Sequence, residues 1–244
     1  MYSLFQKIYN RLNIHNDFLV PRNEMINRII TNSVLSYNIN SYLINYRGIY
    51  KGKKVCIVGC GPSIERFKNE FNFDILIGIN RAFYFKQFNF DFLFAQDQFK
   101  EGFDDFTSYR NESCKKFIAM ITNDVDYKIN NYSLSQINGY RYVLDCIVMN
   151  KIHTEISYFP FADLKGTVFS ALQFALYTCP SEIYLVGFDC DNTSNYASKV
   201  KTNYSFQLKS WNIMKSFINK HYSFIEIFSI NPIGLKGLFK DIYT

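Results

Sequence analysis

The stretch Lys54-Val55-Cys56-Ile57-Val58-Gly59-Cys60-Gly61-Pro62-Ser63 decides the fold class of this chain. Its first half is a short apolar run rich in β-branched residues, which is typical of a buried strand in a parallel sheet. Gly59 and Gly61 allow a tight turn and a close approach to a ligand. Pro62 presets the backbone for a first helical turn, where Ser63 adds a hydroxyl. The stretch predicts a phosphate site at a helix N-terminus, although a tight turn without a ligand fits the same residues.

Beyond this motif, apolar strand patterns alternate with helical patterns. The alternation predicts an α/β fold, namely a single Rossmann-like, doubly wound, mostly parallel sheet. Strands are expected at 55–59, 75–79, 91–95, 117–121, 142–148, 183–187 and 224–230. Helices are expected at 63–71, 167–177 and 204–221.

The two ends of the pattern suggest how the chain is organised. Residues 1–50 carry helical periodicity and predict a helical prefix that covers the core, with a membrane-surface role as the alternative. Residues 51–244 are expected to form the main domain, which carries the sheet. Within it, the polar segment at about 190–204 predicts a small lid.

Composition narrows the function classes. The chain has 244 residues, of which 48% are hydrophobic, so it can bury a large core and is not expected to be disordered. The net charge of +6 favours an acidic ligand or a membrane surface, but no basic run is dense enough to predict a nucleic-acid partner. The six cysteines lack metal-ligand spacing and suggest reduced thiols. With no expected signal peptide or membrane span, a cytoplasmic location follows, with the inner face of the membrane left open.

Polar residues follow several predicted strands directly, where doubly wound sheets bind ligands. Asn80 could hydrogen-bond a base or sugar and Arg81 could clamp a phosphate, although a turn residue beside a solvated arginine is the ordinary alternative. Gln96 and Asp97 close the next strand. Asp97 could contact a ribose, hold a metal or act as a base, or it could cap a helix.

The segment Lys165-Gly166-Thr167 opens a strongly apolar helix. Thr167 is a good N-cap residue, and the helix dipole with the Lys165 charge favours a phosphate here. Simple capping without a ligand is the alternative.

Further along the chain, Asp189 and Asp191 follow an apolar strand and could hold Mg²⁺ or Mn²⁺. Tyr196, in the following loop, could donate a hydrogen bond to a leaving phosphate. Among the histidines, His153 precedes the apolar helix and is the candidate general base.

Taken together, these segments resemble the bacterial sialyltransferases of glycosyltransferase family 42. They equally resemble a wider Gly-x-Gly-Pro-Ser group, which includes flagellin-modifying nonulosonate transferases and pterin pyrophosphokinase-like proteins. The resemblance covers residues 52–240 in order. It rests on the segments Val55–Ser63, Ile79–Phe85, Gly166–Ala175, Glu182–Asp189 and Ser194–Ala197, with the closing strand into Asn231-Pro232.

This resemblance implies a metal-independent, inverting transferase whose donor is a CMP-activated nine-carbon acidic sugar of the sialic-acid type. It also implies that residues 51–244 are the nucleotide-sugar-binding catalytic domain. The implied nucleotide-binding residues are Gly59, Cys60, Gly61, Pro62, Ser63, Asn80, Arg81, Gln96, Lys165, Gly166, Thr167 and Tyr196. The histidine that the family carries in its lid is absent here around 202–205. The acceptor hydroxyl therefore needs another base: Asp97, Asp189, Asp191 or His153.

The partners expected on this reading are a nucleotide sugar and a bacterial glycan or glycolipid acceptor. No cofactor is expected, and peripheral membrane association and a homo-oligomer are left open. Two other readings compete. One is a pyrophosphokinase that holds Mg²⁺ and ATP on Asp97, Asp189 and Asp191. The other is a nucleotide-binding protein without catalysis.

Overall fold

The computed structural model of the chain describes residues 34–68, 70–96, 102–110, 112–121, 134–145, 151–191 and 204–244. These residues build one parallel sheet of nine strands in the order β6-β5-β4-β3-β2-β1-β7-β8-β9, which confirms the predicted α/β fold. The strands are β1 (Lys54–Val58), β2 (Ile75–Ile79), β3 (Phe92–Ala95), β4 (Lys115–Ile121), β5 (Gly139–Asp145), β6 (Phe161–Ala162), β7 (Glu182–Val186), β8 (Glu226–Ile230) and β9 (Lys240–Ile242).

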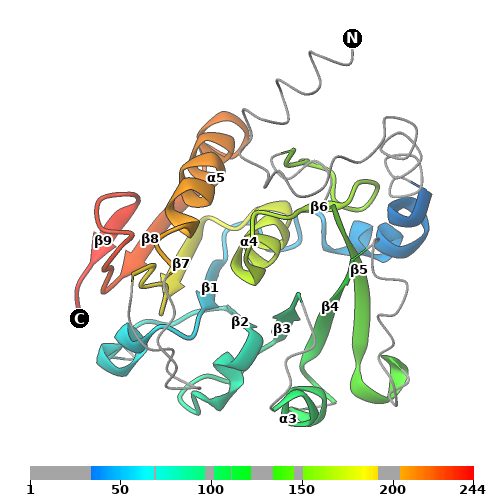
Figure 1. Cartoon of the computed structure of the whole chain (residues 1–244), viewed down its shortest axis with the longest axis horizontal. Helices are drawn as coiled ribbons and strands as arrows, with labels where there is room; N and C mark the ends of the chain where they lie inside the picture. Colours follow the sequence, from blue (N-terminus) through cyan, green and yellow to red (C-terminus); the bar gives the residue numbers. More distant parts are fainter. Residues whose placement is uncertain are drawn as a thin grey trace.

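The strand order reverses direction at β1. The chain adds β2 to β6 successively on one side of β1, and α4 (Thr167–Tyr177) then returns it so that β7 pairs with the other side. Figure 1 shows α4 at the centre of the molecule, with α5 (Gln207–His221) beside β7 and β8. In open α/β sheets, the point where the order reverses leaves a crevice at the carboxyl ends of the strands, which is where ligands bind.

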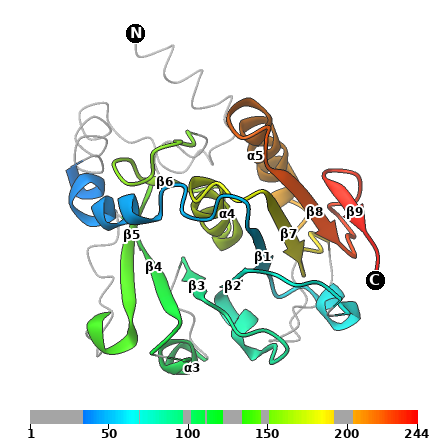
Figure 2. The same ribbon diagram turned by 180° about the vertical axis from the view of Figure 1, so that it is seen from behind.

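Both faces of the sheet are covered. Because side chains alternate along a strand, Val55 and Ile57 of β1 join one core cluster while Cys56 and Val58 join the other. The first cluster packs under α4 and α5. The second packs under α3 (Phe103–Ser108) and under the 3-10 turns η2 (Pro62–Arg66) and η3 (Asn80–Tyr84). The 3-10 turn η4 (Leu134–Ile137) leads into β5. Figure 2 shows the same arrangement from behind.

Several predicted bounds need correction. The helix expected at 63–71 is only the short turn η2, because Phe67 turns to extended backbone and packs its ring against Phe88. The helix expected from 204 begins at Gln207. The strand expected at 142–148 begins earlier, at Gly139, and residues 146–148 lie outside the described part. The elements β6, β9 and α3 were not predicted, since runs this short carry little periodicity.

The described part of the predicted helical prefix packs on the main sheet. Residues 34–39 are helical and continue into η1 (Asn40–Tyr46), whose Leu43 and Tyr46 are buried in the first core cluster. Residues 1–33 lie outside the described part. No helix among the residues that the structure describes is both long and apolar enough to cross a membrane.

Asn40 anchors this prefix, and its removal should destabilise the fold. Its Oδ1 accepts a hydrogen bond from the Val143 N–H at 3.0 Å, and its Nδ2 donates to the carbonyls of Ile156 and Phe159 at 3.1 Å each. Asn40→Ala leaves these backbone groups unpaired, and we expect a loss of about 3 kcal/mol in the free energy of unfolding, measured by urea denaturation. Ser41→Ala is the control, because Ser41 is exposed, and it should change stability by less than about 0.5 kcal/mol. Equal stabilities for the two variants would contradict this role of Asn40.

Candidate functional site

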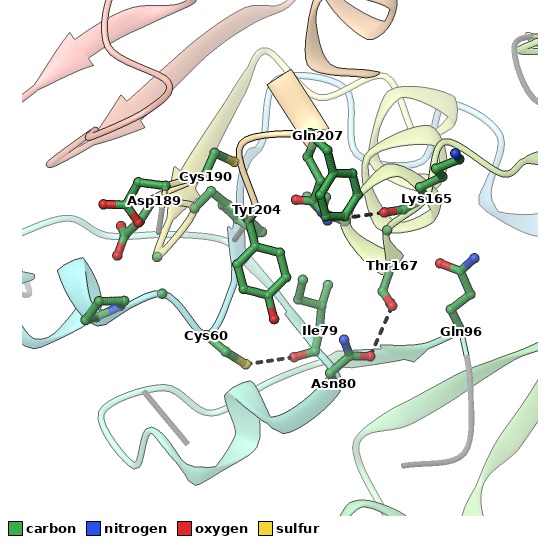
Figure 3. A pocket seen from close by; sticks show the side chains of 18 residues that line it. Cys60, Ile79, Asn80, Gln96, Lys165, Thr167, Asp189, Cys190, Tyr204 and Gln207 are labelled. Atoms are coloured by element: carbon green, nitrogen blue, oxygen red, sulfur yellow. Dashed lines mark hydrogen bonds between the residues drawn. The ribbon is translucent and has the colours of Figure 1, made fainter. Parts of the chain in front are cut away.

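A pocket of about 430 Å³ lies at the carboxyl edge of the sheet, where the strand order reverses. Its walls come from the ends of β1, β2, β3 and β7, from the N-terminus of α4 and from the segment that leads into α5 (Figure 3). The residues that line it are Cys60, Gly61, Pro62, Ile79, Asn80, Gln96, Lys165, Gly166, Thr167, Val168, Gly187, Phe188, Asp189, Cys190, Asp191, Tyr204, Phe206 and Gln207.

The glycine turn after β1 packs on the protein's own backbone. The Gly59 N–H donates to Val186 O and the Gly61 N–H donates to Gly187 O, both at 2.8 Å. A Cβ on Gly59 would lie 2.5 Å from the Gly187 carbonyl oxygen. The sequence suggested that both glycines approach a ligand. In the structure Gly61 lines the pocket, whereas Gly59 serves the contact between the ends of β1 and β7.

Cys60, between the two glycines, lies on the pocket wall. Its thiol donates to the Ile79 carbonyl at 3.5 Å. Burial raises the pKa of this thiol to about 12, with a smaller opposing effect from Arg81. Cys60 is therefore a protonated wall residue and not a thiolate nucleophile.

Asn80 and Thr167 meet across the pocket from different elements. Asn80 follows β2 with a left-handed backbone, φ 49°, which asparagine tolerates better than most residues. The Thr167 hydroxyl donates to Asn80 Oδ1 at 3.1 Å, as Figure 3 shows. Because the amide oxygen accepts from Thr167, the Nδ2 group of Asn80, which has no hydrogen-bond partner among the described residues, can donate to a ligand.

The N-terminus of α4 faces the pocket without a side-chain cap. The prediction that Thr167 is the N-cap is wrong, because Gly166 occupies that position and Thr167 is the first helical residue. The first turn holds no acidic residue, and α4 is buried along its whole length. Lys165 precedes it with a left-handed backbone, φ 62°. An uncapped helix N-terminus with a nearby lysine favours an anion in the pocket.

Asp189 lies behind the Gly-Pro-Ser turn. Its Oδ2 accepts a hydrogen bond from the Ser63 N–H at 2.9 Å, and its Oδ1 is buried with no hydrogen-bond partner among the described residues. Burial raises the pKa of the Asp189 carboxyl, and the Asp191 charge adds to this, while hydrogen bonds from Ser63 oppose it. Asp189 therefore connects the loop after β7 to the turn after β1. Asp191 also lies on the pocket wall but is only half-buried.

The raised pKa of Asp189 predicts a pH effect on stability. The folded state holds this proton more tightly than the unfolded chain, whose aspartate pKa is about 3.9. The unfolding free energy contributed by Asp189 therefore falls as pH rises from about 4 through the folded pKa, and is constant above it. Asp189→Asn cannot titrate, so the stability difference, wild type minus variant, should fall over this interval. Urea denaturation of both proteins between about pH 4 and neutrality measures it, and a pH-independent difference would contradict it.

Tyr204 and Gln207 also line the pocket, although the sequence did not single them out. Tyr204 is held by a hydrogen bond from its N–H to Asp191 O at 2.9 Å, and Figure 3 shows its ring projecting between Cys60 and Thr167. Gln207, in the first turn of α5, donates from Nε2 to Lys165 O at 3.2 Å. The sequence placed Tyr204 at the end of the predicted lid and Gln207 in the helix that follows it, but position alone does not show that a side chain points into a pocket.

The remaining predicted site residues lie elsewhere. Arg81, in η3, and Ser63, in η2, are not among the residues that line the pocket. His153 is not among them either, because its half-buried ring stacks on Phe159 with centroids 4.4 Å apart. Asp97, Tyr196 and most of the predicted lid lie outside the described residues. In the part that the structure describes, no group of three or more His, Cys, Asp or Glu residues could hold a metal ion.

Comparisons with known proteins give one structural likeness. No protein-family model matches the chain, and no curated protein matches it at a significant level. Among solved structures, the chain is similar to the sialyltransferase CstII from Campylobacter jejuni, solved in complex with a substrate analogue, CMP-3FNeuAc. The sequences are 16% identical, the match covers 78% of this chain and 85% of that chain, and the TM-score is 0.44.

Proposed function

We propose that this protein is an inverting glycosyltransferase that moves a sialic-acid-like sugar from a CMP donor to a hydroxyl of a bacterial surface glycan. The observation that carries the proposal is the meeting of Asn80, Thr167 and the uncapped α4 N-terminus in one pocket. These groups offer hydrogen-bond donors and a favourable dipole to a phosphate. The motif resemblance of the sequence supplies the donor class.

In the proposed reaction, the acceptor oxygen attacks the anomeric carbon of the donor sugar while the bond to the phosphate oxygen breaks. CMP leaves with the electron pair of that bond. The α4 N-terminus, Asn80 Nδ2 and the Tyr204 hydroxyl stabilise the growing charge on the phosphate. The acceptor proton passes to a carboxylate, and the sugar configuration inverts.

We assign the general base to Asp191. Among the candidates from the sequence, His153 lies away from the pocket. Asp189 Oδ2 accepts a hydrogen bond from Ser63, and its Oδ1 is buried from solvent. Asp191 lines the pocket and is half-buried, so an acceptor hydroxyl can reach it. Asp97 is the alternative base, since it follows the pocket residue Gln96 directly.

Nucleotide binding followed by turnover tests the function. Calorimetric titration with CMP, UMP, AMP and ATP, each with and without Mg²⁺, should show CMP binding that does not depend on the metal. Incubation with CMP-sialic acid and glycan acceptors should then release CMP. Binding of ATP that requires Mg²⁺ would favour a pyrophosphokinase, and CMP binding without turnover would favour a non-catalytic role. Absence of all binding and turnover would overturn the proposal.

A further inference from the structure

One carboxylate outside the pocket connects two of its walls. Asp163 follows β6 and is not among the pocket-lining residues. Its Oδ1 accepts a hydrogen bond from Gln96 Nε2 at 3.0 Å and another from the Lys165 N–H at 2.8 Å. Gln96 follows β3, and Lys165 precedes α4, so a single oxygen atom joins two elements distant in sequence.

The hydrogen bond from the Lys165 N–H bears on the α4 N-terminus. Lys165 has a left-handed backbone, φ 62°, which is unfavourable for a residue other than glycine and persists only where neighbouring groups hold it. Asp163 holds the N–H of Lys165, and Gln207 holds its carbonyl at 3.2 Å. The direction of the chain at Lys165 sets where Gly166 and Thr167 place the start of the helix.

The hydrogen bond from Gln96 Nε2 to Asp163 fixes the orientation of the Gln96 amide. Asp163 Oδ1 accepts this hydrogen bond, so Gln96 presents its NH₂ group to Asp163. Figure 3 shows the Gln96 oxygen on the side of the amide nearer to Thr167. The pocket therefore offers an acceptor at Gln96 and donors at Asn80 and the α4 N-terminus.

We propose that Asp163 is a positioning residue of the ligand pocket, which holds the α4 N-terminus for a phosphate and turns the Gln96 oxygen toward a hydroxyl or amine of the nucleotide. This inference rests on the proposed function for the identity of the ligand. Asp163 would contact neither the donor sugar nor the acceptor glycan. Its two hydrogen bonds would fix the order of hydrogen-bond donors and acceptors along the pocket. Ligands with an anion at one end and a hydrogen-bond donor at the other fit that order.

Asp163→Ala, Asp163→Asn and Gln96→Ala test the role. Asparagine keeps an acceptor oxygen, so Asp163→Asn should bind CMP within about twofold of wild type, whereas Asp163→Ala should bind about tenfold more weakly. If Asp163 acts in part through Gln96, the double variant Asp163→Ala/Gln96→Ala should bind CMP more tightly than the product of the two single effects predicts. Calorimetric titration gives the affinities.

Hydrogen exchange provides a readout that needs no ligand. Asp163→Ala should speed amide exchange at Lys165–Val168, and Asp163→Asn should not. Unchanged exchange in Asp163→Ala would overturn the inference. So would faster exchange together with wild-type affinity in a protein that binds CMP. A wild-type protein that binds no nucleotide, with exchange as expected, would contradict the proposed function while supporting the positioning of α4 by Asp163.

Discussion

Asp191→Asn is expected to lower kcat by about 100-fold or more while the affinity for CMP stays close to that of the wild type. A positioned general base contributes about 10²–10⁴-fold to such a reaction, and asparagine cannot take the acceptor proton. Asp191 lies on the pocket wall, and its backbone carbonyl holds Tyr204 through the Tyr204 N–H. The substitution keeps the backbone and nearly the same side-chain shape, so the wall should remain in place.

Two variants serve as controls for this result. Asp104→Asn removes an exposed carboxylate on α3, outside the pocket, and should leave kcat unchanged. Asp97→Asn removes the alternative base. A fall in kcat in Asp97→Asn, with near-normal turnover in Asp191→Asn, would move the base to Asp97. Steady-state CMP release, with calorimetric CMP binding for each variant, separates the two outcomes.

Gly59→Ala is expected to lower the free energy of unfolding by about 3 kcal/mol, toward the upper end of what overpacking costs. The new Cβ would lie 2.5 Å from Gly187 O and 2.7 Å from the Phe188 ring. The Gly187 oxygen cannot move freely, because it accepts the hydrogen bond from the Gly61 N–H at 2.8 Å. The ends of β1 and β7 would have to separate, and the pocket wall would separate with them.

Gly52→Ala is the control for this steric argument. Gly52 has φ +75° and no heavy atom within 4 Å of an added Cβ, so alanine there meets only backbone strain, of about 1 kcal/mol. Urea denaturation of both variants gives the comparison. Equal losses of stability would show that the contact with Gly187 is not tight in solution.

Local sequence predicts some residues of the candidate site but not the long-range contacts that position them. Asn80 and Gln96 could be found because each follows a strand, and the carboxyl ends of parallel strands share one edge. Ser63 was expected to face a phosphate, but it binds Asp189 instead. That contact joins residues 126 positions apart. No local pattern encodes such a distance. Nor does any pattern near Asp163 show that its carboxylate reaches Gln96, 67 positions away.

Local sequence predicted the parallel α/β sheet and the strand and glycine turn at its centre, because periodicity and β-branched runs depend only on neighbouring residues. It also determined α4, whose predicted bounds, 167–177, match those in the structure. The tertiary structure alone decided which polar side chains face the pocket. The helix expected after the glycine turn is short because Phe67 packs in the core. Asp189 is buried and accepts a hydrogen bond from Ser63, and the ring of His153 stacks on Phe159. These contacts join segments that are distant in the sequence. They form only when the whole sheet is assembled, because only then is it decided which groups are buried and which hydrogen bonds they make.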